Sequence, residues 1–216
     1  MRTMLIALAL TAFSGTAFAK GKKDKGVANK KSGVRVKITQ NLYDIEKSTD
    51  NSAGDESDPF QTNTFNLLDG GARTEITYKL GNGFEAGGIV GYDNWKTTFD
   101  GDGVASGNGM RALATVAYNF DIGDNAAFIQ PMAGLARASS TPEDGDETLM
   151  KGLELGGAVG VRIKLFKRVF IDPQFEFTQT KWGAEFDGDT VENVDGDDWE
   201  MKQTNMGLRW GLNVLI

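Results

Sequence analysis

The sequence predicts an all-β protein, an eight-stranded antiparallel up-and-down transmembrane β-barrel with short periplasmic turns and long extracellular loops. Three observations carry this prediction. Apolar and polar side chains alternate in eight segments between residues 33 and 216, which is the period of a strand with two different faces. Tight turns join these segments at one end and long acidic connections at the other. No segment has the periodicity of a convincing amphipathic helix.

The first three segments alternate regularly. In 34–42, valine, isoleucine and leucine alternate with polar residues that include Arg35 and Lys37. In 72–80, alanine, threonine, isoleucine, tyrosine and leucine alternate with arginine, glutamate, threonine and lysine. In 84–93, phenylalanine, alanine, valine and tyrosine alternate with acidic residues, glycines and one isoleucine. Each pattern predicts a strand with one apolar face.

The next three segments continue the series. Segment 110–120 places methionine, alanine, valine, tyrosine and phenylalanine on one face. Segment 126–137 is less regular. Segment 152–164 alternates leucines and valines with Glu154, Arg162 and several glycines. These patterns predict the fourth, fifth and sixth strands.

The last two predicted strands are 169–177 and 206–216. The final segment keeps large apolar side chains at every second position up to Ile216, as a strand with a neighbour on both sides would. Pro131 and Pro173 fall within predicted strands, and a closed barrel offers no edge where a missing N–H is harmless. We therefore expect a β-bulge at each proline.

The connections between segments have two lengths. The tight turns are 81–83, 122–124 and 166–168. The long connections are 44–63, 99–108, 139–150 and 183–199. Up-and-down topology places all the tight turns at one end of a barrel and all the long loops at the other, which is typical of transmembrane barrels.

The apolar face of each strand could contact a membrane or a ligand. A soluble lipocalin-like carrier would turn it inward around an apolar ligand. Three features favour lipid: the polar face mixes large charges with glycine and alanine, the last strand is patterned throughout, and aromatic residues gather near the tight turns, where a membrane interface would lie. These aromatic residues are Tyr78, Phe84, Tyr118, Phe120 and Phe166.

The N-terminal part of the sequence predicts export. Arg2, the apolar run 4–13 and the Ala-Phe-Ala motif at 17–19 have the form of a secretory signal peptide. We therefore expect a signal peptide at 1–19, a basic flexible periplasmic tail at 20–32 and a barrel domain at 33–216. The sequence has no cysteine, so no disulfide stabilises the exported chain.

The sequence resembles the small OmpA/OmpX-type outer-membrane barrels of Gram-negative bacteria. The resemblance rests on the signal ending at Ala19, the glycine-rich strand GLELGGAVGVRIKLF (152–166) and the terminal strand ending at Ile216. It implies a location in the cell outer membrane and a barrel assembly machinery as partner during biogenesis. Such barrels typically end in an aromatic residue, whereas this chain ends in isoleucine.

If the apolar faces of the strands contact lipid, the charged faces line the lumen. Eight strands leave an interior just wide enough for side chains, so balanced charges there are expected to pair into a plug. A narrow porin-like channel for small solutes is the alternative. The predicted lumen ion-pair network comprises Arg35, Lys37, Arg73, Glu75, Lys79, Glu85, Asp93, Arg111, Glu154, Arg162, Lys164, Asp172, Glu176 and Arg209.

The long connections are strongly acidic. Segments 44–59, 99–108, 139–150 and 183–199 hold 19 acidic residues and one basic residue, Lys47. Solvated loops explain this composition, and so does a calcium or magnesium site, although none of the clusters completes an EF-hand. The candidate metal ligands are Asp187, Asp189, Asp195 and Asp197.

Basic residues recur where strands emerge at the long-loop end. They lie at the expected height of phosphate groups in an outer leaflet of lipopolysaccharide, and they could equally pair with the acidic loops. This candidate lipid-phosphate rim comprises Lys96, Arg137, Lys151, Lys181 and Lys202.

The composition argues against an enzyme. The sequence has no histidine and no cysteine, which excludes Ser–His and Cys–His nucleophile systems and His-ligated metals. The net charge of −7 argues against a nucleic-acid partner. We expect a monomer without cofactor, apart from the possible loop cation, that has a structural or surface-recognition role such as adhesion, with an unknown extracellular ligand.

Overall fold

The computed structural model describes residues 33–51, 60–65, 72–99, 102–142, 147–186 and 189–216. The predicted signal peptide and basic tail lie outside these residues, so both stay predictions. The described secondary structure is all β, and none of the described residues forms a helix that could cross a membrane.

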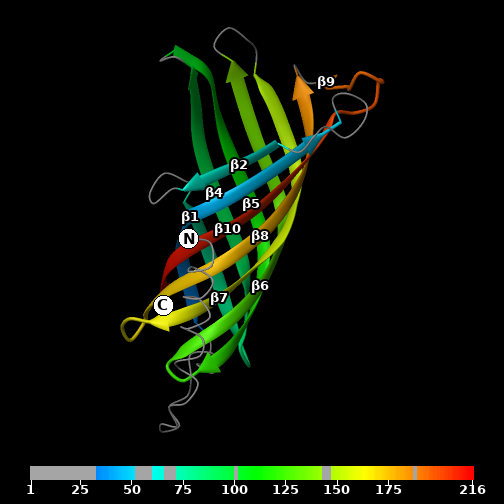
Figure 1. Ribbon diagram of the computed structural model, residues 1–216. Helices are drawn as coiled ribbons and strands as arrows, with labels where there is room; N and C mark the ends of the chain where they lie inside the picture. Colours follow the sequence, from blue (N-terminus) through cyan, green and yellow to red (C-terminus); the bar gives the residue numbers. More distant parts are fainter. Residues whose placement is uncertain (1–32, 52–59, 66–71, 100–101, 143–146, 187–188) are drawn as a thin grey trace.

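Eight long strands and two short ones form a single sheet (Figure 1). They are β1 (Val34–Asp50), β2 (Phe60–Phe65), β3 (Arg73–Gly81), β4 (Phe84–Phe99), β5 (Asp102–Ile122), β6 (Asn125–Pro142), β7 (Thr148–Lys164), β8 (Val169–Phe186), β9 (Asp189–Thr190) and β10 (Glu200–Leu215). All pairs are antiparallel, and β10 pairs with both β8 and β1, which closes the sheet into a barrel. The predicted eight-stranded up-and-down barrel is confirmed.

The strands are staggered around the barrel. Following paired residues from Val36 on β1 through the ring leads back to Lys47 on β1. These positions are eleven residues apart, and a bulge between Asn41 and Tyr43 accounts for one of them. A stagger of ten residues over eight strands implies a strand tilt of roughly 35–45°.

The three tight turns all lie at one end of the barrel, as predicted. Gly81, Asn82 and Gly83 have φ of 97°, 50° and 85°, and Gly123 has φ of 64°. Glycine and asparagine tolerate this left-handed region best. At Gly83 a Cβ would also lie 2.6 Å from the carbonyl oxygen of Asn119, so both backbone conformation and space require glycine there.

The apolar faces point away from the barrel axis. Ile76, Val90, Leu155 and Val159 are each 50–55% exposed, although they lie in the middle of strands. On β7 the exposed band runs ten residues from Leu153, which is about 33 Å along a strand that rises about 3.3 Å per residue. The tilt reduces this to a height of roughly 25 Å, the height of the apolar band of outer-membrane barrels.

Aromatic residues mark the tight-turn end of this band. Tyr78, Phe84, Phe120 and Phe166 are 46–71% exposed. The ring of Tyr118 lies 4.7 Å from that of Phe84 and 4.6 Å from that of Phe120, between centroids. These rings lie where the sequence predicts an interface girdle, so the outward direction of the apolar face is confirmed.

The predicted long connections are shorter than expected. Much of 44–63, 99–108, 139–150 and 183–199 belongs to strands, because β1, β4, β5, β6, β7 and β8 continue well beyond the apolar band. Above the band the outer face of a strand is polar, so the apolar-outward alternation that marks the strands within the band ends there.

The predicted bulges at Pro131 and Pro173 are wrong. Pairing of β5 with β6 is interrupted beside Pro131 and pairing of β7 with β8 beside Pro173, but the same register resumes on both sides. The other neighbour pairs with each proline without a gap, Gly157 with Pro131 and Trp210 with Pro173. A proline lacks one donor, so losing one local bond on one side costs less than shifting a whole strand.

Candidate functional site

The lumen contains a charged cluster near the tight-turn end. Arg162 on β7 lies at its centre, 3.1 Å from Asp172 and 3.5 Å from Glu85 across the barrel. Glu85 is also 2.9 Å from Arg35. Asn213 donates a hydrogen bond of 2.6 Å to the Asp172 carboxylate. All five side chains are at most 1% exposed, so these charges are compensated by one another and not by water.

A single lysine connects its own strand, β1, to three others in the middle of the lumen. The Lys37 Nζ lies 2.6 Å from Glu75 and donates hydrogen bonds of 3.3 Å to Gln130 and 3.2 Å to Gln174. Gln130 in turn donates 3.0 Å to the Thr115 hydroxyl. The ammonium thus has acceptors for its three donors, which is what a buried lysine requires.

A second charged cluster lies towards the outer end. Glu176 on β8 contacts both Arg73 and Arg209, the latter at 3.0 Å. Arg111 lies 3.1 Å from Glu154 and 3.7 Å from Asp93. Exposure of the side chains rises towards the outer end of the barrel. The Arg73 side chain is 7% exposed, whereas that of Arg111 is 18% exposed.

Aromatic rings separate the cationic side chains within the lumen. Phe128 lies beneath Arg162 at 5.2 Å and beside the Lys37 ammonium at 5.4 Å, both measured to its centroid. Phe170 lies 5.6 Å from the Arg35 guanidinium. Cations over ring faces are attracted to them, so these two inward-pointing rings also stabilise the charges.

Two of the predicted lumen residues, Lys164 and Lys79, are not among the ion pairs named above. Lys164 lies at the tight-turn rim, 3.6 Å from the exposed Asp124. Lys79 is buried on the inner face of β3, opposite Glu85 in the register. The other predicted residues lie in the clusters described above.

Several lumen residues were missed by the sequence analysis. Neutral polar side chains complete the network, and they occupy the polar face of predicted strands, so parity alone could have identified them. They are Asn119, Gln130, Gln174 and Asn213. Asp44 was assigned to a loop, but the bulge before Tyr43 turns it towards Gly207, where its Oδ1 is buried. A single irregular residue such as this bulge leaves no sequence signal.

The candidate rim cations form an arc at one height. Arg137 pairs with Lys151 across β6 and β7, and Lys181 pairs with Lys202 across β8 and β10. The outward-facing cations can be followed from Arg137 on β6 through β7, β8 and β10 to Lys47 on β1. Relative to the paired register, their positions shift four residues towards the tight-turn end along this path. With a stagger of ten residues over eight strands, side chains at constant height are expected to shift by about five residues over these four strand pairs. The arc lies immediately above the apolar band.

Some rim cations also pair with outward-facing acids. Lys151 lies 2.6 Å from Glu185, and Lys181 lies 2.6 Å from Glu200. These contacts are more than one-third exposed, so they hold the lysine side chains only weakly. The side chain of Lys96 lies outside the described residues.

The candidate metal ligands are spread along an exposed hairpin. Asp189 lies in β9, whereas Asp195 and Asp197 flank Gly196, where their backbone N–H groups donate to the Asn193 side chain. Asp187 lies outside the described residues. Within the described part of the chain no three acidic groups lie close enough to hold a metal ion. The loop cation therefore stays a prediction.

Comparison with protein-family models and with curated protein sequences gave no match. Three solved structures are similar in chain topology. Neisserial surface protein A is 14% identical, with a TM-score of 0.45, and the match covers 86% of this chain and 99% of that one. The outer membrane protein OprG from Pseudomonas aeruginosa is 9% identical, with a TM-score of 0.48 and coverage of 87% and 98%.

The third similar structure is the attachment invasion locus protein Ail of Yersinia pestis, in complex with the heparin analogue sucrose octasulfate. It is 15% identical, with a TM-score of 0.39 and coverage of 84% and 98%. All three are eight-stranded outer-membrane β-barrels of the OmpA/OmpX type. Identities this low transfer no residue role to the present chain.

Proposed function

We propose that this chain is an integral barrel of the outer membrane, closed along its axis by ion pairs, that serves a structural or surface-recognition role without catalysis. One observation carries the proposal. The charged side chains of the lumen cluster near the tight-turn end, centred on Arg162, are paired across the barrel and almost completely buried. The outward apolar band supports the membrane location.

A solute crossing this lumen would have to separate buried ion pairs. Removing one partner of such a pair costs about 3–5 kcal/mol, because the other charge is left without compensation in a poorly solvated interior. Arg35, Glu85, Arg162 and Asp172 form one connected set, so displacing one side chain disturbs them all. This cost supports a closed barrel over the narrow channel.

The test is the conductance of the purified full chain in planar lipid bilayers. We expect no stepwise currents. The matched variant replaces Arg35, Glu85, Arg162 and Asp172 together with serine, which removes the cluster without leaving a net charge, and it is expected to conduct. Heat-modifiable migration in gels checks that both proteins are folded. Steady unit currents from the unaltered chain would establish the narrow channel instead.

The lipocalin-like carrier is a separate alternative with its own test. A carrier would place its apolar side chains around a central ligand, whereas Ile76, Val90 and Val159 face outward here. We expect the native protein to fractionate with outer membranes. Recovery in the aqueous fraction without detergent would favour the carrier.

A further inference from the structure

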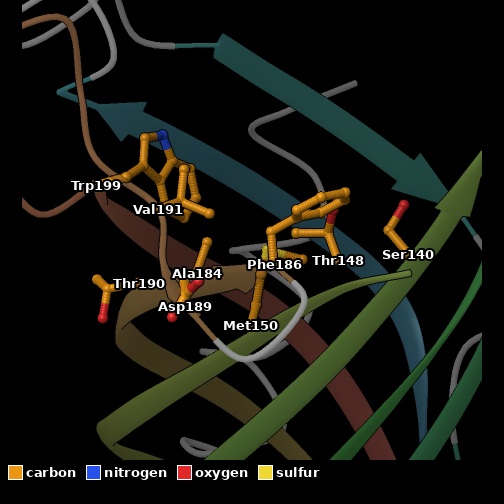
Figure 2. Close-up of a pocket in the computed structure, with 9 residues that line it drawn as sticks. All are labelled: Ser140, Thr148, Met150, Ala184, Phe186, Asp189, Thr190, Val191 and Trp199. Atoms are coloured by element: carbon orange, nitrogen blue, oxygen red, sulfur yellow. The ribbon is translucent and has the colours of Figure 1, made fainter. Parts of the chain in front are cut away.

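A cavity opens at the outer mouth of the barrel, above the charged clusters (Figure 2). Its volume is about 840 Å³, within the range of small-molecule sites. It is lined by Ser140, Thr148, Met150, Ala184, Phe186, Asp189, Thr190, Val191 and Trp199. These residues come from β6, β7, β8, β9 and the segment that leads into β10. The function proposed above does not use this cavity.

The walls of the cavity are mainly apolar and aromatic. Figure 2 shows Trp199 and Val191 projecting from the loop segment, with Phe186 and Met150 grouped near the strands. The Phe186 side chain is 44% exposed although it continues the inward-facing series of β8. An aromatic ring held at the mouth of a lumen with this much free surface offers contact area to a ligand.

The loop side of the cavity is held by backbone hydrogen bonds. The Val191 N–H donates to the Ala184 carbonyl at 3.0 Å, and the Trp199 N–H donates to the Val191 carbonyl at 2.7 Å. Phe186 pairs with Asp189 where β8 meets β9. Val191 is therefore bonded to β8 and Trp199 to Val191, so the backbone that carries the indole has a defined place beside the strands.

The charge around the cavity has one sign. Asp189 is the charged residue among those that line it, and none of the lining residues is basic. The segment between Val191 and Trp199 adds Glu192, Asp195, Asp197 and Asp198. The nearby lysines of β7 and β8 face outward and pair with Glu185 and Glu200. The resulting negative potential favours a cationic ligand and disfavours an anionic one.

We infer that the outer mouth binds small organic cations, specifically amines or ammonium compounds with an aromatic or short apolar body. The apolar body would pack against Phe186 and Met150, and the cation would lie by the face of Trp199 and near the Asp189 carboxylate. Cation–π attraction and the carboxylate together distinguish this ligand from a neutral molecule of the same shape. The inference rests on the proposed barrel only in that its mouth faces the outside.

The test compares three ligands of similar size and different charge. The full chain is reconstituted in lipid nanodiscs, since detergent would compete for the cavity, and titrated calorimetrically with 2-phenylethylamine, 2-phenylethanol and phenylacetate. We expect saturable binding of the amine that is at least ten times tighter than binding of the alcohol, with phenylacetate weakest. Equal affinities for the amine and either other probe, or no saturable binding of the amine, would overturn the inference.

Variants locate the binding to the cavity. Asp189→Asn is expected to weaken amine binding at least fivefold and to leave alcohol binding unchanged, whereas Trp199→Leu weakens both. Asp195→Asn is the matched control, because it removes the same charge from the hairpin outside the cavity, and it should change amine affinity less than twofold. If Asp195→Asn and Asp189→Asn have equal effects, the amine responds only to diffuse surface charge and the site is refuted.

Conductance separates this inference from the proposed function. A barrel that conducts but binds the amine at Asp189 and Trp199 would refute the closed lumen and leave the site intact. A closed barrel without amine binding would refute the site alone.

Discussion

Arg162 shows what a single residue does in this lumen. Its guanidinium contacts Asp172, Glu85 and Asn119 from three other strands, and Phe128 covers its face. The sequence predicts its inward direction by parity and a role in pairing. It does not predict the partners, because which strands lie opposite each other across a barrel depends on the stagger and not on local pattern.

Removing this side chain should destabilise the barrel strongly. Arg162→Ala leaves Asp172 and Glu85 with less compensation, and we expect the free energy of unfolding to fall by about 3–5 kcal/mol. The measurement is urea unfolding in phospholipid vesicles followed by tryptophan fluorescence. Lys164→Ala is the matched control on the same face of β7, and its partly exposed pair with Asp124 should contribute less than about 1 kcal/mol. Equal effects of the two variants would show that the buried network does not stabilise the fold.

At the scale of elements, the rim consists of residues that are far apart in the sequence and are brought to one height by the pairing of strands. Lys47, Arg137, Lys151, Lys181 and Lys202 lie on five consecutive strands at one height above the apolar band. The sequence predicts four of them from their place at strand ends. Lys47 was missed because the strand was predicted to end before it, and the bulge at Tyr43 sets its outward direction.

This arc should hold anionic lipid. Each basic residue near an anionic surface contributes about 1 kcal/mol, so we expect charge reversal of Arg137, Lys151 and Lys202 to glutamate to reduce co-purifying lipopolysaccharide at least tenfold. Native mass spectrometry of protein extracted from outer membranes measures the bound lipid. Reversal of Lys167 and Arg168 at the tight-turn end is the control and should change nothing. Unaltered lipid in the rim variant would show that these three cations do not hold lipopolysaccharide.

The strands themselves were predicted well within the apolar band and poorly above it. Segment 152–164 coincides with the lower part of β7, where lipid and lumen differ most. β6 extends to Pro142 and β8 to Phe186, beyond the band, where the outer face is polar and the apolar-outward alternation ends. The cavity between Phe186 and Trp199 lies entirely in this upper region, which is why no pattern in the sequence indicated it.

At the scale of the molecule, three zones of charge follow one another along the barrel axis. A buried, balanced network fills the lumen, an arc of cations lies above the apolar band, and acidic residues surround the outer mouth. The barrel is closed by pairing of β10 with β1, and one stagger applies to all its strands. Each zone therefore lies at one height around the same axis. The composition of each zone could be read from the sequence, whereas the stagger that aligns them required the structure.

A membrane location requires hydrocarbon to contact the outward apolar band, and spin-label accessibility tests this contact directly. The chain has no cysteine, so Val159→Cys and Lys151→Cys each accept a single label. In lipid vesicles we predict that the label at 159 collides with dissolved oxygen and not with a water-soluble nickel chelate, whereas the label at 151 is accessible to the chelate. Chelate access at 159 equal to that at 151, or access of neither reagent to 159, would contradict the membrane-facing band.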